Sequence, residues 1–328
     1  ADGGASFAED KEENAVERTS GSGKRKYFES NTGKERQGRK IGVSKWGKSY
    51  YNRTRVTADY GMGEWLTMIY HTILEAIGHT PVIRLQHLPD PQGAQVLVKF
   101  EGLNVGGSIK TRTAYQMIEN AERDGKIGPD TIIVEPTSGN QGIGLALIGA
   151  VKGYRTIIIM PDSVSEERRK LVRHYGAEVI LIHDAGNIGD CIEECLQTAL
   201  RMQRENPKVF VPQQFSNPGN LEAHHYHTAV EILEQVAGPI HGFCSGVGTG
   251  GTISGIGEVL RSQNPGMLIW AVEPENAAIL SGGSVGTHLQ MGIGDGVIPE
   301  NLNQEIYDEI CIVTDEEAIR TAKELARR

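Results

Sequence analysis

Lys110 stands where the sequence predicts the first turn of an amphipathic helix, directly after a glycine-rich turn. Gly106 and Gly107 let the backbone turn sharply, and Ser108 can cap the helix. A helix N-terminus carries partial positive charge, so a lysine there is unfavourable by a few tenths of a kcal/mol. If the side chain is turned inward, that field and burial lower the pKa of the amine and make it a better nucleophile. Lys110 is therefore the first candidate for chemistry.

A second polar turn, "EPTSGNQGIG" at 135–144, precedes an apolar helix. It groups hydroxyl, amide and backbone N–H donors around two glycines, in the order Thr137, Ser138, Gly139, Asn140, Gln141 and Gly142. Such a turn makes a compact anion cradle, for which a carboxylate is a natural guest. Taken alone, these residues are better explained as an ordinary capped turn.

A third turn, "SGVGTGGTISG" at 245–255, is the best phosphate site in the chain. Its consecutive N–H groups and two hydroxyls lead into a helix N-terminus and belong to Gly248, Thr249, Gly250, Gly251 and Thr252. The same turn matches a dinucleotide fingerprint, Gly246-x-Gly248-x-x-Gly251, with Glu273 about 20 residues on at the position of a ribose-binding acid. A lone fingerprint of this kind is weak evidence, and it leaves the other two turns unexplained.

One ligand would explain all three turns. It carries a single phosphate for residues 248–252 and an aldehyde for Lys110, and it acts on an amino acid whose carboxylate needs the second turn. Pyridoxal 5'-phosphate has this chemistry. The turns therefore predict a pyridoxal-phosphate site.

The elements that must position these turns alternate in type along the chain. Apolar runs rich in Ile and Val predict strands at 96–100, 131–136, 156–161, 178–182, 243–246 and 268–274. Helical periodicity lies between them, at 108–124, 140–153, 165–176, 188–205, 220–236 and 252–263. Strands without polar alternation are buried on both faces, which predicts an α/β fold with parallel sheets covered by helices. Ligands in such folds bind at the carboxyl ends of strands, where the three turns lie.

The first part of the chain has a different composition. Residues 1–60 contain 13 Lys and Arg against 9 Asp and Glu, which leaves 20 basic and 33 acidic residues of the totals of 33 and 42. Residues 1–67 lack apolar periodicity and are predicted to form a disordered or accessory arm. The acidic body gives no basic face for nucleic acid. No apolar run has the length of a membrane span, and four scattered cysteines suit a reducing cytoplasm.

Six segments, in unbroken order, resemble cysteine synthase (O-acetylserine sulfhydrylase), a member of the β-family of fold type II pyridoxal-phosphate enzymes. They are "IGHTPVIRL" (77–85), "NVGGSIKTR" (104–112), "EPTSGNQG" (135–142), "PQQFSNPGN" (212–220), "SGVGTGGT" (245–252) and "MGIGDGVIPENL" (291–302). The resemblance covers about residues 68–328 and implies two three-layer α/β domains with mostly parallel sheets, as in the tryptophan synthase β-subunit. The large, phosphate-binding domain would comprise 68–103 and 215–328, and the small, substrate-loop domain 104–214. The resemblance also implies a homodimer.

The resemblance implies a role for each matching residue. Lys110 would form the Schiff base, and Asn140 would hydrogen-bond the ring hydroxyl of the cofactor. The substrate carboxylate would be held by Thr137, Ser138, Gly139 and Gln141, helped by Gln214. Gly248, Thr249, Gly250, Gly251 and Thr252 would bind the phosphate, and the loop from Gly292 to Gly296 would border the mouth of the site. The family continues beyond the segment that ends here at Arg328 with a turn whose serine faces the pyridine nitrogen, so no partner is assigned to that nitrogen.

The implied reaction is β-replacement on O-acetylserine by sulfide, which gives L-cysteine and acetate through an aminoacrylate. Three alternatives stay open. The first is another β-replacement or a β-elimination on the same scaffold, giving cystathionine, cyanoalanine or diaminopropionate or acting as a serine or threonine dehydratase. The second is a nicotinamide-dependent oxidoreductase built on the Gly246 fingerprint. The third is a non-catalytic paralogue.

Other groups of reactive residues are assigned to packing. The cluster of His224, His225 and His227 lies in a predicted helix and is interpreted as a solvated or partly packed face, because no fourth metal ligand is near. For the same reason, no metal is predicted at Cys191 and Cys195. Cys244 and Cys311 lie in apolar runs and are predicted to be buried thiols.

Overall fold

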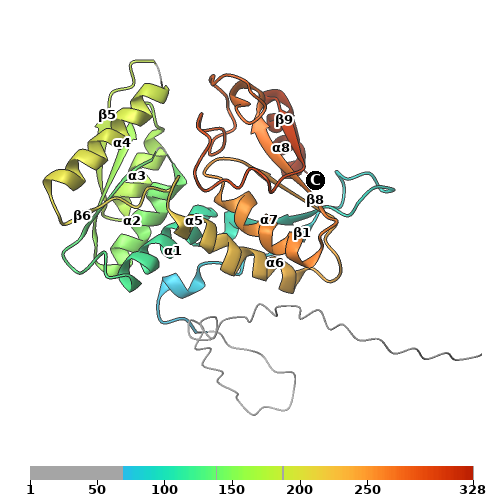
Figure 1. The fold of residues 1–328 in the computed structure, drawn as a ribbon, viewed down its shortest axis with the longest axis horizontal. Helices are drawn as coiled ribbons and strands as arrows, with labels where there is room; N and C mark the ends of the chain where they lie inside the picture. The colour runs from blue at the N-terminus through green and yellow to red at the C-terminus, as the bar shows by residue number, and fades with distance from the viewer. Residues whose placement is uncertain (1–68, 138, 187, 328) are drawn as a thin grey trace, which may run out of the picture. The chain divides into compact units, whose positions relative to one another are not determined.

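Two parallel β-sheets organise residues 69–137, 139–186 and 188–327, the part of the chain described by the computed structural model (Figure 1). The first has the order β5-β4-β3-β6, with β3 at Ile132–Pro136, β4 at Arg155–Pro161, β5 at Glu178–Ile182 and β6 at Val209–Phe210. The second has the order β7-β8-β9, with β7 at Gly242–Gly246, β8 at Leu268–Pro274 and β9 at Glu309–Val313. A short antiparallel pair joins β1 (Val82–Arg84) to β2 (Leu97–Lys99). The predicted α/β fold with parallel sheets is confirmed; the predicted arm at 1–67 and Ser138 lie outside the described residues.

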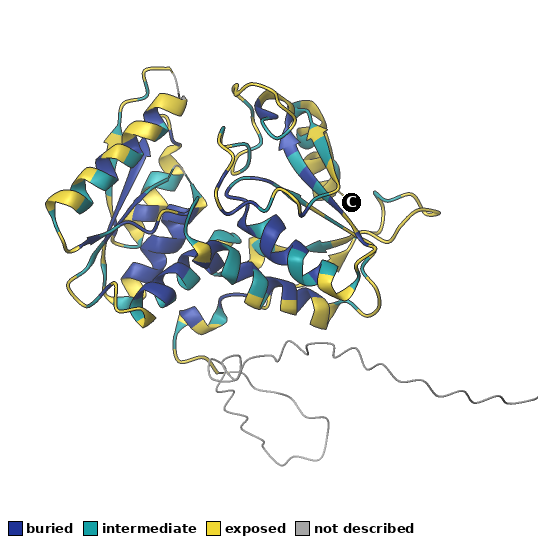
Figure 2. Cartoon of the chain, in the orientation of Figure 1, coloured by how far each residue is buried: buried dark blue, intermediate teal, exposed yellow. Residues whose placement is uncertain are grey.

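Helices cover both faces of the first sheet. They are α1 (Lys110–Arg123), α2 (Asn140–Lys152), α3 (Glu166–His174) and α4 (Ile188–Glu205). Ile133, Ile158 and Met160 pack into one apolar cluster with residues of α1 and α2. Val134 and Ile159, which alternate with them along the strands, pack against α4 in another. The dark-blue interior in Figure 2 follows this three-layer arrangement.

One helical segment with a π-helical turn inside it, together with two further helices, accompanies the second sheet. The segment consists of α5 (Pro218–Ala223), a π-helical turn labelled η5 (His224–Thr228) and α6 (Ala229–Gln235). It precedes α7 (Gly251–Gln263), and α8 (Asp315–Arg327) follows β9. Short 3-10 turns lie at Ile73–Ala76, Glu101–Leu103, Val105–Gly107 and Glu275–Ala277. The helix predicted at 220–236 is confirmed at 218–235, and it contains a π-helical turn that the sequence did not indicate.

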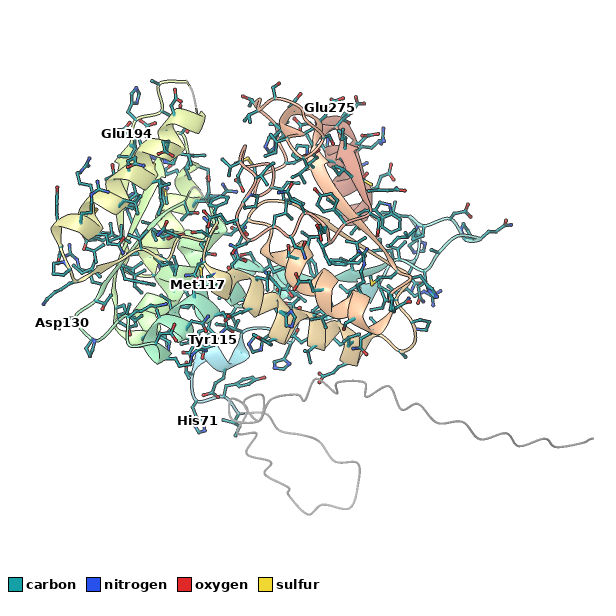
Figure 3. All side chains as sticks on the ribbon, in the orientation of Figure 1. His71, Tyr115, Met117, Asp130, Glu194 and Glu275 are labelled. Carbon is teal, nitrogen blue, oxygen red and sulfur yellow. The ribbon has the colours of Figure 1, made fainter. Side chains whose placement is uncertain are left out.

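Apolar and charged side chains differ in their burial, as three residues labelled in Figure 3 illustrate. Met117 of α1 is fully buried, whereas Asp130 and Glu194 are exposed. The cysteines of α4 are buried, and burial raises the pKa of the Cys195 thiol to about 12, so it stays protonated. None of the helices in the described ranges is long and apolar enough to cross a membrane.

The prediction of buried thiols in the second sheet is wrong. Cys244 is exposed, and Cys311 is only partly buried. Cys244 pairs with Trp270, and Cys311 with Val272, so all four side chains share one face. The opposite face carries the buried residues of β8 that pack with α7. The face with the cysteines is partly open to solvent, which an apolar run of five residues does not reveal.

Candidate active site

The turn before α1 is built as the glycines require. Gly106 and Gly107 have φ of +79° and +77°, in the left-handed region that favours glycine. A Cβ on Gly106 would approach the hydroxyl oxygen of Thr111 to 2.5 Å. The Ser108 hydroxyl accepts the backbone N–H of Lys110 at 3.3 Å. The helix begins at Lys110, two residues after the start predicted at 108, and Lys110 lies in its first turn as predicted.

The side chain of Lys110 is directed toward the glycine-rich turn before α7. Its Nζ donates to Oγ1 of Thr249 at 3.1 Å, although the two residues lie 139 positions apart. Burial lowers the pKa of Lys110 below its usual value, while the carboxylate of Asp295 opposes the shift. A larger fraction of the amine is therefore neutral and nucleophilic than in an exposed lysine.

Thr249 is held by a second donor that the sequence analysis missed. The amide of Asn220, fully buried, donates at 2.8 Å to Thr249 Oγ1 and at 2.8 Å to the carbonyl of Gln214. Because the Thr249 oxygen accepts from both Lys110 and Asn220, its own proton can be directed toward a third group. Asn220 ends the segment "PQQFSNPGN", which was the available signal for its role.

The glycines of the 248–252 loop are required by close packing. Gly250 has φ of +77°, and a Cβ there would lie within 2.8 Å of Leu302 atoms. A Cβ on Gly251, the first residue of α7, would reach the Asn220 Oδ1 at 2.3 Å. The N-cap residue of α7, Gly250, makes no side-chain capping hydrogen bond. The backbone donors of its first turn are thus presented in a form suited to an anion.

His224 lies behind this loop, fully buried, so the prediction that it belongs to a solvated or partly packed face is wrong. Its Nε2 lies 3.2 Å from Thr252 Oγ1 and its Nδ1 lies 3.1 Å from Thr228 Oγ1. Burial, aided by the charges of Lys110 and Arg112, lowers the pKa of His224 well below its usual value and keeps it neutral. The close approach to α7 depends on Gly255, where a Cβ would lie 2.9 Å from the Cβ of His224.

The second turn lies against the first turn of α1. Gly144 of α2 lies so close to the start of α1 that a Cβ added to it would lie 3.2 Å from the Lys110 carbonyl oxygen. Gln141 is buried, and its Oε1 accepts from Thr113 Oγ1 at 2.8 Å. Its Nε2 is buried without a hydrogen-bond partner in the described part of the chain, so this N–H donor is available to a bound ligand. Thr137 Oγ1 accepts the N–H of Gly139 at 3.2 Å.

Not every predicted residue joins the cluster. Asn140 begins α2 with an exposed side chain, and within the described residues it makes no hydrogen bond to Lys110 or to the 248–252 loop. Gln214 is buried, and its carbonyl accepts from Asn220 and Asn301.

The loop from Gly292 to Gly296 packs on the 248–252 loop. Gly294 donates its N–H to the carbonyl of Val247 at 2.9 Å. A Cβ on Gly248 would lie 2.8 Å from the Gly292 carbonyl and 3.1 Å from Oδ2 of Asp295. Asp295 thus places a carboxylate beside the turn that Lys110 contacts, a feature the sequence analysis did not single out.

Glu273 does not have the free carboxylate of a ribose-binding acid. One oxygen accepts the N–H of Leu280 at 2.9 Å, and the other accepts the N–H and hydroxyl of Ser281 at 3.0 and 2.6 Å. Both oxygens are used by the chain itself, which disfavours the nicotinamide alternative.

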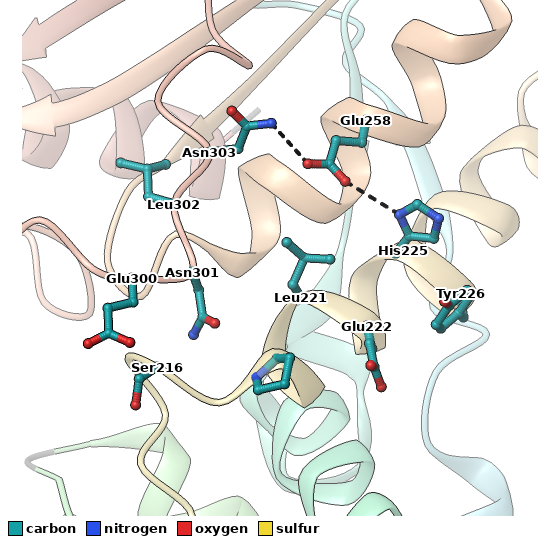
Figure 4. Close-up of a pocket in the computed structure, with 11 residues that line it drawn as sticks. Ser216, Leu221, Glu222, His225, Tyr226, Glu258, Glu300, Asn301, Leu302 and Asn303 are labelled. Atoms are coloured by element: carbon teal, nitrogen blue, oxygen red, sulfur yellow. Dashed lines mark hydrogen bonds and ion pairs between the residues drawn. The ribbon is translucent and has the colours of Figure 1, made fainter.

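A separate groove of about 540 Å³ is drawn in Figure 4. Glu258 in its wall accepts from Asn303 Nδ2 at 3.0 Å and lies 3.7 Å from Nδ1 of His225. None of the predicted site residues lines the groove. The chemistry proposed below is therefore placed at Lys110 and not here.

Comparisons with known proteins show the family of the chain. Residues 73–328 match the family model described as "Pyridoxal-phosphate dependent enzyme". A cysteine synthase of Staphylococcus aureus is 46% identical over 256 residues, which are 78% of this chain and 81% of the relative. A hydrogen sulfide-producing enzyme of Fusobacterium nucleatum has a similar structure, with a TM-score of 0.75, 40% identity and coverage of 80% and 85%. So does an O-ureido-L-serine synthase, with a TM-score of 0.75, 37% identity and coverage of 79% and 81%.

Proposed function

We propose, because the chain belongs to the pyridoxal-phosphate-dependent enzymes of the cysteine synthase type, that it replaces the acetate of O-acetyl-L-serine by sulfide to give L-cysteine. The general class, β-replacement on an amino acid with pyridoxal phosphate, follows from the family. The choice of O-acetylserine and sulfide is the proposal. The observation that supports the cofactor chemistry is the contact of Lys110 Nζ with Thr249, which joins the candidate amine to the phosphate-type loop, and the 46% identity to a cysteine synthase supports the choice of O-acetylserine and sulfide.

The residues present fit pyridoxal phosphate. Lys110 would hold its aldehyde, and the uncapped N–H groups at Gly248 to Thr252 would hold its phosphate. Asn140 is proposed for the ring hydroxyl, which requires its exposed side chain to turn toward the site. When bound, the cofactor supplies an electron sink for negative charge at the substrate Cα.

The chain's own groups supply binding and proton transfer. Thr137, Ser138, Gly139 and Gln141, with Gln214, are proposed to hold the substrate carboxylate. The unpartnered Nε2 of Gln141 is the strongest support, because a carboxylate would satisfy it. Holding the carboxylate there would direct the Cα–H bond toward Lys110, whose lowered pKa suits an amine that takes up and returns a proton.

The replacement Lys110→Ala tests the assignment. Purified protein loaded with pyridoxal phosphate is expected to lose the visible absorbance band of the bound cofactor, because no other described lysine contacts Thr249. Lys126→Ala, at a side chain that is 63% exposed, is the control and should keep the band. An unchanged spectrum in Lys110→Ala would rule out the lysine assignment.

A different acceptor is the second candidate, favoured by Asp295. Its carboxylate lies beside Gly248 and interacts with Lys110 and His288. A negative charge there repels hydrosulfide anion, but it can accept the proton of a neutral thiol or water as that group attacks. The measurement is the ratio of products formed from sulfide and from a neutral thiol in competition. Asp295→Ala is expected to shift that ratio toward sulfide, and an unchanged ratio would remove the support for this candidate.

Assembly and domain organisation stay predictions. We propose a cytoplasmic homodimer, as the resemblance to cysteine synthase implies. The boundaries at 103/104 and 214/215 are likewise proposed, within a body in which residues 68–328 form one unit. Light scattering of the purified chain measures the assembly.

A further inference from the structure

Glu135 is a fully buried carboxylate at the carboxyl end of β3, directly before the 137–141 cradle. Its Oε2 accepts the backbone N–H of Gln213 at 2.9 Å, and its Oε1 accepts the N–H of Gln214 at 3.0 Å. Each oxygen therefore serves one of two consecutive peptide groups. The reaction proposed above assigns no role to this side chain.

The N–H groups of Gln213 and Gln214 need an acceptor because the pairing between β3 and β6 ends before these residues. β6 pairs with β3 only at Val209 and Phe210, opposite Ile132 and Ile133. Gln213 then adopts a φ of +58°, a left-handed conformation that is unfavourable for a residue with a side chain. The two N–H groups that the ladder no longer uses are satisfied by Glu135, which fixes the strained turn.

A continuous set of hydrogen bonds leads from this turn to the reactive lysine. The Gln214 carbonyl accepts from Asn220 Nδ2 at 2.8 Å, and the same amide donates to Thr249 Oγ1 at 2.8 Å. Thr249 also accepts from Lys110 Nζ. The backbone of Glu135 leads into the cradle, while its side chain holds the peptide that supports the other loop.

We propose that Glu135 is a positioning residue that ties the 137–141 cradle to the 248–252 loop through the Gln214 peptide, and that the tie is complete only while the carboxylate is ionised. The inference rests on the proposed function, because it assigns the two loops to the substrate carboxylate and the cofactor phosphate. Protonation would place a hydrogen on one of the two oxygens and remove the negative charge, which leaves that oxygen a weaker acceptor, so one of the two bonds would be weakened.

The hydrogen bonds from the Gln213 and Gln214 peptides to Glu135 are expected to change in strength near neutral pH. Burial raises the pKa of Glu135 to about 7, while the N–H groups of Gln214 and Gln213 lower it. No charged side chain in the described residues is among the influences on it. The turn is therefore expected to be held firmly above pH 7 and to loosen as the pH falls below it.

The chain contains a matched control. Glu273 ends β8 in the same Glu-Pro context, is equally buried, and accepts the consecutive N–H groups of Leu280 and Ser281. It is not part of the path to Lys110. Glu273→Gln thus reproduces the chemical change of Glu135→Gln at another strand end.

The first experiment is amide hydrogen exchange on the full-length protein loaded with pyridoxal phosphate. In the wild type, protection of the Gln213 and Gln214 amides, corrected for intrinsic rates, is expected to fall about tenfold from pH 8 to pH 6, because one of the two hydrogen bonds is weakened. Glu135→Gln should lower protection at pH 8 and abolish the pH step, and Glu273→Gln should leave both unchanged. Equal protection at both pH values in the wild type would overturn the proposal without any variant.

The second experiment separates positioning from general stability. Glu135→Gln is expected to raise the KM for O-acetylserine about tenfold at pH 8 and to retain the visible cofactor band. Its KM relative to the wild type should converge toward pH 6, where both tie the turn poorly. A wild-type protein without a cofactor band would instead refute the proposed function, while the exchange result would still decide the role of Glu135. An unchanged KM in Glu135→Gln at pH 8 would overturn the positioning role.

Discussion

Replacing Arg112 by leucine is expected to destabilise the protein by about 3–5 kcal/mol, the usual effect of removing one partner from a buried ion pair. The Arg112 side chain is 3% exposed and donates from Nε to Glu101 at 2.8 Å and from Nη1 to Glu231 at 2.7 Å. Leucine would leave both carboxylates without their main partner. Among the described residues, the cation that Glu231 would keep is Lys99, at 2.7 Å.

The pH dependence gives an independent magnitude. Although burial raises it, the hydrogen bonds and charge of Arg112, followed by Lys99, lower the pKa of Glu231 from 4.5 to about 2. Lowering this pKa from 4.5 to about 2 corresponds to about 3 kcal/mol. This stability is present above pH 4.5 and is lost as the pH falls through about 2. The two magnitudes describe the same interaction and are not added.

The assay is urea unfolding at pH 7 of the wild type, Arg112→Leu, Glu231→Gln and the double variant. The double variant should lose at least about 2 kcal/mol less than the sum of the single losses, because the pair is broken only once. Arg155→Leu is the control: it breaks a pair with Glu178 whose side chains are 56% and 54% exposed, and it should cost less than about 1 kcal/mol. A loss below 1 kcal/mol in Arg112→Leu, or additive single losses, would refute the reasoning.

Two further outcomes follow from local geometry. Gly250→Ala is expected to cost about 3 kcal/mol and to weaken binding of pyridoxal phosphate in equilibrium dialysis, because the new Cβ meets Leu302 and the φ of +77° is left-handed. Gly238→Ala, with a φ of +98° but open space around it, should cost only the backbone strain of about 1–2 kcal/mol, and equal losses would contradict the packing argument. An alkylating reagent is expected to label exposed Cys244 in the native protein and to spare Cys195; mass spectrometry reads both, and faster labelling of Cys195 would contradict its burial.

The sequence predicts elements well where burial is continuous. The apolar run at 156–161 is β4 at Arg155–Pro161, because both faces of this strand are buried and residues 157–161 are apolar. The predicted helix at 188–205 is α4 with the same limits, because a long periodic segment buries one consistent face. β6 has two residues and leaves no periodic signal. The π-helical turn at His224–Thr228 is also invisible to periodicity, since its extra residue shifts the face without ending the helical pattern.

Part of the site was predictable for a different reason. Glycines in the sequence indicate the turn before Lys110 and the loop at 248–252, because only glycine permits these conformations and close approaches. The sequence did not indicate the roles of Asn220, Glu135 and Arg112, since their hydrogen-bond partners lie 29, 79 and 119 residues away in the chain. A buried polar residue looks like an exposed one until the tertiary structure supplies its partners. Ser138 lies outside the described residues, so its role stays a prediction.

The placement of two basic residues at the start of α1 has a physical explanation in these contacts. The first turn contains Lys110 and Arg112 and no acidic residue, the reverse of the charge preference at a helix N-terminus. Arg112 is offset by carboxylates supplied from outside the helix, at Glu101 and Glu231. Within the described residues Lys110 forms no ion pair of this kind, and burial lowers its pKa against the opposing charge of Asp295, which reduces the positive charge opposed to the helix dipole. The unfavourable position thus favours the neutral amine that the proposed reaction with an aldehyde requires, while the neighbouring ion network keeps the helix end in place.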